Sequence, residues 1–411
     1  MFLQRNRFFL FVRPTSRRGW DLGILTLVLL GLASTAPAQS TGSIPVPYDS
    51  SVKRIGVAVV SASPELAALL QNAFRIHGAF DLAPASTAQY TLRADLTPGG
   101  QVSIAVEPKV MGGTSFTATG SGSAWYEAAY RAGDQVVEKL TTYPGFFAGR
   151  LAFVSTRAKA LEIFTSDLLG EHVTGWKSGS ISIHPCWSPD GSKLLYTSNY
   201  RTGFLDLTLL NVSTGLQKAI ASYKGTNTGG VISPDGRSIA MILSSTGTPQ
   251  LYVSDLEGRN VRALTHSASL KSSPTWSPDG KQIILSDDTR GEPLLYLISS
   301  SGGPIQPLKT GIPRYSGDAA WNPRDPALVA FMEEQGNQSF IAVYSFKTGT
   351  SEIYDALDGS QPCWANDGRH IFFTHHASGL DQVYLLDTVT KKVSRLTTKG
   401  ASEPAFYYPA K

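Results

Sequence analysis

Four polar residues of this sequence have side chains that could bind a ligand, and they recur at similar places along the chain. They are His184, Asp318, Gln361 and Glu403, each just before a short strand that we expect to be the inner strand of a repeated β unit. Imidazole, carboxylate and amide groups are all metal ligands, so a ring of them could hold an ion. Polar loop residues also line most channels without chemistry, and we favour that interpretation.

Motifs typical of enzymes do not occur. The sequence has no G-x-S-x-G turn, no H-E-x-x-H, no C-x-x-C and no P-loop spacing. His375 and His376 are adjacent, but neighbouring residues of a strand point to opposite faces, so they are poor joint ligands. A solvated hairpin is the favoured place for both. We predict no catalytic residue, no cofactor and no metal ligand.

The elements that position these residues come from a sequence repeat. Residues 274–280 read P-T-W-S-P-D-G, and complete or degenerate copies stand at 185–191, 230–236, 319–323, 362–368 and 404–406. The aromatic or isoleucine position recurs at 187, 232, 276, 321, 364 and 406, with gaps of 45, 44, 45, 43 and 42 residues. A repeat of this length is typical of propeller blades.

Each repeat predicts four strands. The S-P-D-G motif fits a type I turn, which joins two antiparallel strands, and two further strands follow. Residues 150–156, 161–167 and 171–176 form a unit without an inner strand, whereas 402–407 form an inner strand alone. We predict that these two fragments pair in one shared blade and close a six-bladed ring, which removes exposed strand edges.

The repeated aromatic residue is expected to pack between blades. The two cysteines, Cys186 and Cys363, stand just before it in their copies. We expect both to be small core residues that are too far apart for a disulfide.

The first part of the sequence predicts export and a second domain. We expect a signal peptide over 1–38, cleaved after Ala38, a flexible arm over 39–52, a small α/β domain over 53–142, a linker over 143–149 and the propeller over 150–411. The α/β domain should have strands at 54–60, 90–96, 102–107 and 116–119 and helices at 64–77 and 125–140. The predicted fold class is thus α/β plus an all-β six-bladed propeller.

Charge argues against nucleic-acid binding. The chain has 36 Lys and Arg residues against 32 Asp and Glu residues. Five arginines and one aspartate lie in the predicted signal peptide, so the remainder is balanced.

These features together resemble the TolB family, the periplasmic component of the Tol-Pal envelope system. The resemblance rests on the export signal, the domain order, the W-S-P-D-G repeats and the junction sequence at 129–141, 143–147 and 150–154. It covers nearly the whole mature chain. It implies a monomeric, non-enzymatic periplasmic scaffold that supports outer-membrane invagination during cell division and envelope integrity.

The resemblance also implies two partners. A Pal-like outer-membrane lipoprotein would bind the loops before the inner strands, at Thr226, Asn227, Gly229, Ser272, Ser273, Asp318 and Gln361. A TolA-like inner-membrane protein would bind the arm, at Ile44, Val46, Tyr48 and Asp49. Pro45 and Pro47 remove backbone donors that strand pairing with this partner would use.

A second hypothesis stays open on the residues alone. An exported propeller enzyme, such as a metal-dependent hydrolase or lyase acting on glycans or lactones, would use the polar channel residues as ligands. A stoichiometric metal ion in the purified protein would distinguish it from a scaffold.

Overall fold

The computed structural model describes residues 52–155, 160–176, 181–312, 314–354, 358–377, 379–397 and 399–409. The described residues belong to one compact unit. The predicted signal peptide and the predicted partner-binding arm, with Ile44, Val46, Tyr48 and Asp49, lie outside them. Within these ranges, no helix has both the length and the apolar character needed to span a bilayer.

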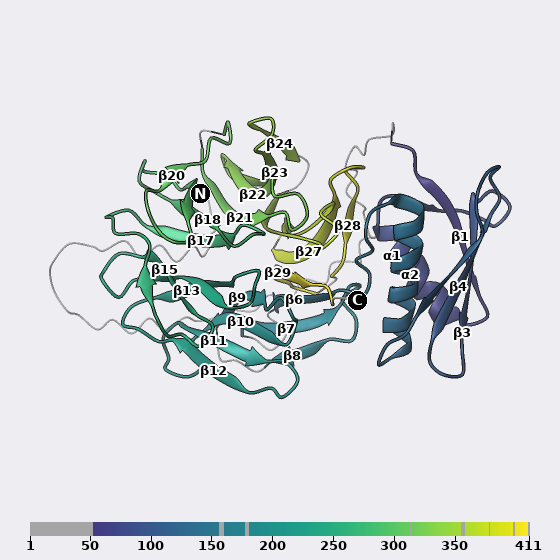
Figure 1. The fold of residues 1–411 in the computed structure, drawn as a ribbon, viewed down its shortest axis with the longest axis horizontal. Helices are drawn as coiled ribbons and strands as arrows, with labels where there is room; N and C mark the ends of the chain where they lie inside the picture. Colours follow the sequence, from purple (N-terminus) through teal and green to yellow (C-terminus); the bar gives the residue numbers. More distant parts are fainter. Residues whose placement is uncertain are drawn as a thin grey trace, which may run out of the picture. The chain divides into compact units, whose positions relative to one another are not determined.

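The N-terminal part is a five-stranded sheet covered by two helices, shown in purple and blue in Figure 1. The elements are β1 (Ile55–Ser61), α1 (Pro64–Ile76), β2 (Phe80–Leu82), β3 (Tyr90–Leu96), β4 (Val102–Pro108), β5 (Phe116–Gly120) and α2 (Trp125–Thr141). The sheet order is β2-β1-β3-β4-β5. The sequence predicted both helices and four of these strands. It missed β2, because three residues are too few for a periodic pattern.

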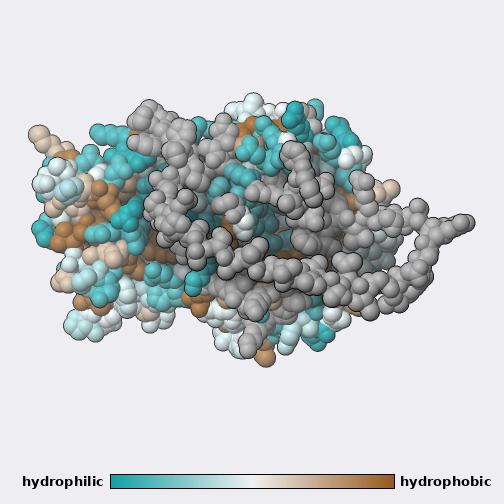
Figure 2. Space-filling view, turned by 180° about the vertical axis from the view of Figure 1, so that it is seen from behind, coloured by the Kyte–Doolittle hydropathy of each residue, from teal (hydrophilic) through white to brown (hydrophobic). Residues whose placement is uncertain are grey.

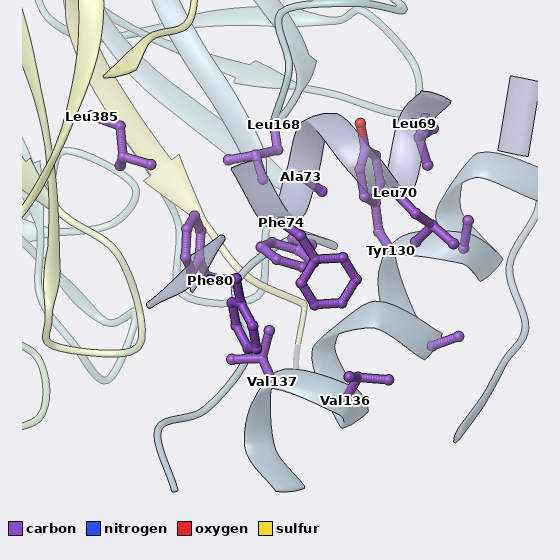
Figure 3. Packing of buried hydrophobic residues seen from close by; sticks show 14 of the residues in the cluster. Leu69, Leu70, Ala73, Phe74, Phe80, Tyr130, Val136, Val137, Leu168 and Leu385 are labelled. Atoms are coloured by element: carbon purple, nitrogen blue, oxygen red, sulfur yellow. The ribbon is translucent and has the colours of Figure 1, made fainter. Parts of the chain in front are cut away.

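The helix α1 begins where the sequence provides a cap. Ser63 accepts a hydrogen bond from the backbone N–H of Leu66 at 3.2 Å, and Pro64 occupies the first helical position. Buried residues of α1 then face the core (Figure 3), where Leu70 and Phe74 meet Tyr130 and Val137 of α2. The same cluster includes Leu168 and Leu385 from the propeller, so the two parts share one apolar core.

The propeller consists of six four-stranded sheets. Blades one to three contain β29 (Ser402–Tyr407), β6 (Arg150–Ser155), β7 (Glu162–Asp167) and β8 (Thr174–Trp176); β9 (Ser182–Trp187), β10 (Lys193–Ser198), β11 (Asp206–Asn211) and β12 (Gln217–Ala221); and β13 (Asn227–Ile232), β14 (Ser238–Leu243), β15 (Gln250–Asp255) and β16 (Arg262–Ala263). Blades four to six contain β17 (Lys271–Trp276), β18 (Gln282–Asp287), β19 (Leu294–Ser299) and β20 (Gln306–Pro307); β21 (Ser316–Trp321), β22 (Leu328–Gln335), β23 (Gln338–Ser345) and β24 (Thr350–Tyr354); and β25 (Gly359–Trp364), β26 (His370–Ala377), β27 (Leu380–Asp387) and β28 (Val393–Arg395).

The predicted ring closure is confirmed. The strand β29 pairs antiparallel with β6, with Ala405 opposite Ala152 and Phe406 opposite Leu151. In Figure 1 the yellow β29 lies beside β6, which is more than 240 residues away along the chain. One blade is therefore built from both ends of the propeller sequence, so that no blade is left incomplete.

The repeated turn has the geometry that its residues predict. In the copy at 188–191, the N–H of Gly191 donates to the carbonyl of Ser188 at 2.8 Å, and the Ser188 hydroxyl donates to Asp190 at 2.6 Å. Gly191 has φ 67°, a conformation that glycine adopts without strain. The turn thus fixes the hairpin between the inner strand and the second strand.

The repeated aromatic residue packs between blades, as predicted. Trp276 of blade four lies in one cluster with Ala240 and Val253 of blade three, and its indole N–H donates to the carbonyl of Val231 at 3.1 Å. Cys186 and Cys363 are free thiols. Burial raises the pKa of Cys186 to about 11 and that of Cys363 to about 12, so both stay protonated at neutral pH.

The surface of the α/β part carries several exposed apolar side chains, among them Val60, Leu96, Val110 and Met111. Figure 2 shows hydrophobic residues gathered over this part, at the left of that view.

Candidate functional site

One position of the inner strand is unusual in every blade. It lies three residues before the repeated aromatic position and has φ between 46° and 61° in all six copies, which are His184, Gly229, Ser273, Asp318, Gln361 and Glu403. At the same place the pairing of the inner strand with its neighbour shifts by a β-bulge in each blade. A bulge re-aims one side chain out of the regular alternation of a strand.

The left-handed conformation at these positions carries an energetic cost. Only Gly229 adopts such a φ without strain. A non-glycine residue in this region costs roughly 1–3 kcal/mol, and such residues cluster at functional sites. Five polar side chains held at this cost around one axis identify the best candidate site of the molecule.

The six residues are connected into a ring, because the inner strands of successive blades are neighbours all the way round. The Ser273 hydroxyl donates to Asp318 Oδ1 at 2.9 Å, and the backbone N–H of Glu403 donates to Gln361 Oε1 at 3.3 Å. The backbone N–H of His184 donates to the Glu403 carboxylate. His184 also lies 3.2 Å from the Thr228 hydroxyl of the next blade.

We call His184, Gly229, Ser273, Asp318, Gln361 and Glu403 the polar ring. Its ionisable side chains are mainly acidic. Asp318 and Glu403 each carry a carboxylate, and the His184 ring lies 4.0 Å from Glu403. Burial raises the pKa of Asp318 above its ordinary value, although the Ser273 hydroxyl and the positive field of His184 act in the opposite direction. The arrangement provides acceptors near the start of the inner strands, and its one hydroxyl, that of Ser273, donates to the Asp318 carboxylate.

The structure corrects where several predicted contact residues lie. Gly229, Ser273, Asp318 and Gln361 belong to the polar ring, but they lie inside β13, β17, β21 and β25 and not in the loops before them. Thr226 is in a loop, and its backbone N–H donates to the Ser244 hydroxyl oxygen at 2.7 Å. Ser272 lies in β17 next to the ring. The bulge explains the difference, because the inner strand continues through it.

Asn227 is fully buried and cannot contact a partner directly. Its side-chain amide donates to the carbonyls of Leu205 at 3.1 Å and Tyr223 at 2.9 Å, and its carbonyl oxygen accepts from the N–H of Tyr223 at 2.9 Å. It therefore fastens the loop before β11 to the loop before β13.

These two loops carry aromatic side chains that the sequence analysis missed. Phe204 is 74% exposed and Tyr200 61% exposed in the loop between β10 and β11, and Tyr223 is 42% exposed in the loop between β12 and β13. Arg201 and Lys224 are exposed beside them. The sequence did contain a signal for this patch. The loop between β10 and β11 of blade two is longer than the corresponding loops of blades five and six, and it contains two aromatic residues. We call Tyr200, Phe204 and Tyr223 the aromatic patch.

The adjacent histidines differ from the prediction in part. His375 and His376 point to opposite faces of β26, as expected, but they do not form a solvated hairpin. His375 is buried and lies 3.0 Å from the carbonyl of Asp358, whereas His376 lies 2.7 Å from the Ser360 hydroxyl and 2.9 Å from Asp381. The longer β26 and β27 extend the hairpin that holds them.

Metal-type ligands meet at two places among the described residues. The groups are His77, Asp367 and His370, and Asp167, Glu171 and His172, each with three ligand atoms within 4.8 Å of one another. Neither group includes a residue of the polar ring. In the first, both ring nitrogens of His370 already have partners. In the second, the Asp167 carboxylate accepts hydrogen bonds from the Tyr130 hydroxyl and the N–H of Glu171 and lies 2.9 Å from His172 Nδ1. Both groups are hydrogen-bond networks between the α/β part and the propeller.

Comparison with known proteins decides the family. A family model described as PD40, the TolB beta propeller domain, matches residues 137–357, which is more than half of the chain. The chain belongs to the TolB propeller family.

Individual relatives agree with the TolB assignment. The Tol-Pal system protein TolB of Anaeromyxobacter dehalogenans strain 2CP-1 is 34% identical over 149 residues, which are 36% of this chain and 34% of that protein. The Tol-Pal system protein TolB of Francisella tularensis strain WY96-3418 is 31% identical over 147 residues, 33% of this chain and 34% of the relative. The matched region thus spans about a third of the length of these curated relatives.

A solved TolB structure has the same fold. The crystal structure of TolB from Acinetobacter baumannii superposes with a TM-score of 0.77 at 22% identity, over 89% of this chain and 98% of that one. At this identity the likeness establishes the architecture alone.

Proposed function

We propose that this chain is a non-enzymatic scaffold of the Tol-Pal system, located in the periplasm, which binds a Pal-like outer-membrane lipoprotein with the channel face of its propeller. The polar ring is the observation that carries this proposal. Five non-glycine residues hold a costly backbone conformation near the start of the inner strands, and their groups hydrogen-bond to one another. The names of the curated relatives support the same class.

The lipoprotein would contact the polar ring and the aromatic patch together. The ring positions lie near the beginning of the inner strands, and the loops that carry the patch precede β11 and β13, which places them at the same end of blade two. Tyr, Phe and Arg are enriched at protein interfaces, where aromatic anchors supply most of the binding energy. Phe204 is the strongest candidate for such an anchor because it is both large and the most exposed of the three.

A binding measurement tests this assignment. We expect Phe204→Ala to weaken the lipoprotein's affinity by about 10-fold to 30-fold, equivalent to about 1.4–2 kcal/mol, when isothermal titration calorimetry is run with its soluble domain. Leu216→Ala is the matched control. Leu216 is 72% exposed, but it lies in the turn after β11, at the opposite end of that strand. Equal affinity of both variants with the wild type would contradict the assignment.

The export signal and the domain boundary rest on the sequence pattern, and the TolA-like partner and the role in cell division rest on the sequence resemblance. We propose that residues 1–38 direct export and that the arm with Ile44, Val46, Tyr48 and Asp49 binds a TolA-like inner-membrane protein. We also propose that residues 143–149 are the boundary between the α/β domain and the propeller, and that the assembly supports outer-membrane invagination during cell division. A chain lacking residues 39–51 should lose the TolA-like partner in a pull-down while it keeps the lipoprotein.

A further inference from the structure

The contact between helix α1 and blade six contains a buried cluster of charged groups. His370, at the start of β26, is 0% exposed, and Asp367 and Asp387 are 3% and 1% exposed. Arg369 is 5% exposed and pairs with Asp387 through Nε at 2.8 Å and Nη2 at 2.6 Å. Buried charges are retained at such cost only when each has a partner.

The geometry around His370 specifies its protonation. Its Nδ1 lies 2.6 Å from Asp367 Oδ2, and its Nε2 lies 2.7 Å from the backbone carbonyl oxygen of His77. A carbonyl oxygen can only accept, so Nε2 must carry a hydrogen. Asp367 Oδ1 also accepts from the N–H groups of Arg369 at 2.9 Å and His370 at 3.0 Å. Although burial acts in the opposite direction, these bonds and the charge of His370 hold the pKa of Asp367 below its ordinary value, so this carboxyl is ionised. Both ring nitrogens therefore donate, and His370 is an imidazolium cation.

The acceptor of that second bond belongs to the other part of the molecule. His77 is the residue at the C-terminal end of α1, where backbone carbonyls lack helical partners and carry partial negative charge. A second cation from blade six, Lys392, donates to the carbonyl of Arg75 in the last turn of the same helix. The end of α1 is thus capped by two positive groups of the propeller.

Of the charged groups that face His370, the carboxylates of Asp367 and Asp387 favour the imidazolium, and the Arg369 guanidinium opposes it. Asp367 and Arg369 come from the turn before β26, Asp387 ends β27 with Oδ2 at 3.9 Å from His370 Nε2, and Phe146 of the connecting segment is apolar. His77 lies edge-on to His370, with ring centroids 4.6 Å apart. Burial and the charge of His370 hold the pKa of His77 well below its ordinary value, so this neighbour stays neutral. The buried cluster thus has no net charge, because the carboxylates of Asp367 and Asp387 are matched by Arg369 and the His370 imidazolium.

We propose that the docking of helix α1 onto blade six is proton-linked, with the buried His370 imidazolium as the bond between the two parts. When His370 loses its proton, one of its two hydrogen bonds must be lost. The Asp367 carboxylate then also loses its countercharge in a buried site. The contact between the α/β part and the propeller consequently weakens as the pH rises. This inference goes beyond the scaffold role and does not depend on any partner.

The direction of the pH effect follows from the environment of the ring. Burial lowers the pKa of His370, but the carboxylates of Asp367 and Asp387 outweigh it and hold that pKa above its ordinary value. The folded state then binds a proton more tightly than the unfolded chain. The stabilisation is fully present below the ordinary histidine pKa of about 6.5 and is lost as the pH rises through the raised value.

The experiment uses the full mature chain and two measurements. The first is the ring-nitrogen spectrum of ¹⁵N-histidine-labelled wild-type protein at pH 7, in which we expect one histidine with both ring nitrogens protonated. His370→Gln assigns that signal by its disappearance. The second is hydrogen exchange of the amides at the end of α1, corrected for the intrinsic rate. Protection in the wild type should fall by up to tenfold per pH unit above the pKa of His370.

The variants separate a proton link from a merely structural role. In His370→Gln the same amides should lose this pH dependence, whereas His266→Gln, which changes an exposed histidine of blade three, should retain it. A wild-type spectrum at pH 7 without a doubly protonated histidine would overturn the proposal, and so would unchanged pH dependence in His370→Gln. If that variant does not fold, the wild-type spectrum still decides.

Discussion

At the scale of single residues, close approach between the two parts of the molecule depends on one glycine. Gly78 follows the C-terminal end of α1 and has φ 78°. A Cβ added there would lie 2.1 Å from Asp387 Oδ2 and 2.8 Å from Thr390 Oγ1. Any side chain would push the helix end away from the buried charges of blade six.

A pair of substitutions separates this clash from backbone strain. Gly78→Ala should lower the free energy of unfolding by about 3 kcal/mol or more, because strain and displacement of the buried ion pair add. Gly100→Ala is the control, since Gly100 has nearly the same φ of 76° and no atom within 4 Å of the added Cβ. It should cost only about 1–2 kcal/mol. Equal losses in urea unfolding would show that the close approach is unimportant.

The repeated aromatic residue is the second test at this scale. Trp276→Ala should lower the free energy of unfolding by roughly 3–5 kcal/mol, because it leaves a cavity between blades three and four. Trp276→Phe keeps most of the volume and mainly removes the hydrogen bond to Val231, which is worth about 1 kcal/mol. A thermal melt in which the alanine variant is as stable as the wild type would contradict the packing between blades.

At the scale of elements, a buried side chain holds the loops that we assign to partner binding. Asn227 connects the loop before β11 with the loop before β13 through the carbonyls of Leu205 and Tyr223. Preorganised loops bind more tightly because less conformational entropy is lost on association.

Asn227→Ala should therefore weaken lipoprotein binding without removing any contact residue. We expect faster hydrogen exchange in both loops and a loss of about 1–3 kcal/mol of local stability from the carbonyls left unpaired. Ser222→Ala, an exposed position in the same loop, is the control and should change neither quantity. Unaltered exchange in Asn227→Ala would mean that the two loops are held by other contacts.

The sequence was most informative about the secondary-structure elements and their pairing. The repeat period and the two complementary fragments predict the six blades and the pairing of β29 with β6, because each copy carries the same turn and the same interblade aromatic residue. The bulge could not be predicted in this way. His184, Ser273, Asp318, Gln361 and Glu403 have side chains that do not signal a positive φ, so their positions were assigned to loops.

At the scale of the whole molecule, the contact between the two parts was also beyond the sequence. His77 and His370 are 293 residues apart and share no motif. Only the folded chain reveals that the His370 ring lies against the backbone carbonyl of His77 and so caps the C-terminal end of α1. The connecting segment is fastened in a similar way. Asp134 of α2 accepts hydrogen bonds from the N–H groups of Phe147 at 2.6 Å and Ala148 at 3.0 Å and from the Tyr408 hydroxyl at 2.8 Å.

A second buried group near this contact also has a raised pKa. Burial raises the pKa of Asp134 to about 7, so this carboxyl, like His370, binds a proton more tightly when the chain is folded. The contribution of Asp134 is fully present below its ordinary pKa of 3.8 and is lost as the pH rises to about 7, whereas that of His370 is fully present below about 6.5 and is lost as the pH rises through its raised pKa.

We propose that the face of this propeller with the polar ring and the aromatic patch is a docking surface for an envelope lipoprotein. The most direct test is site-specific photocrosslinking in living cells, with a photoreactive phenylalanine analogue at position 204 and, as the control, at position 216. We predict a covalent adduct with a Pal-like lipoprotein from position 204 and none from position 216. An adduct from position 216 alone, or from neither position in cells that contain the lipoprotein, would contradict the account.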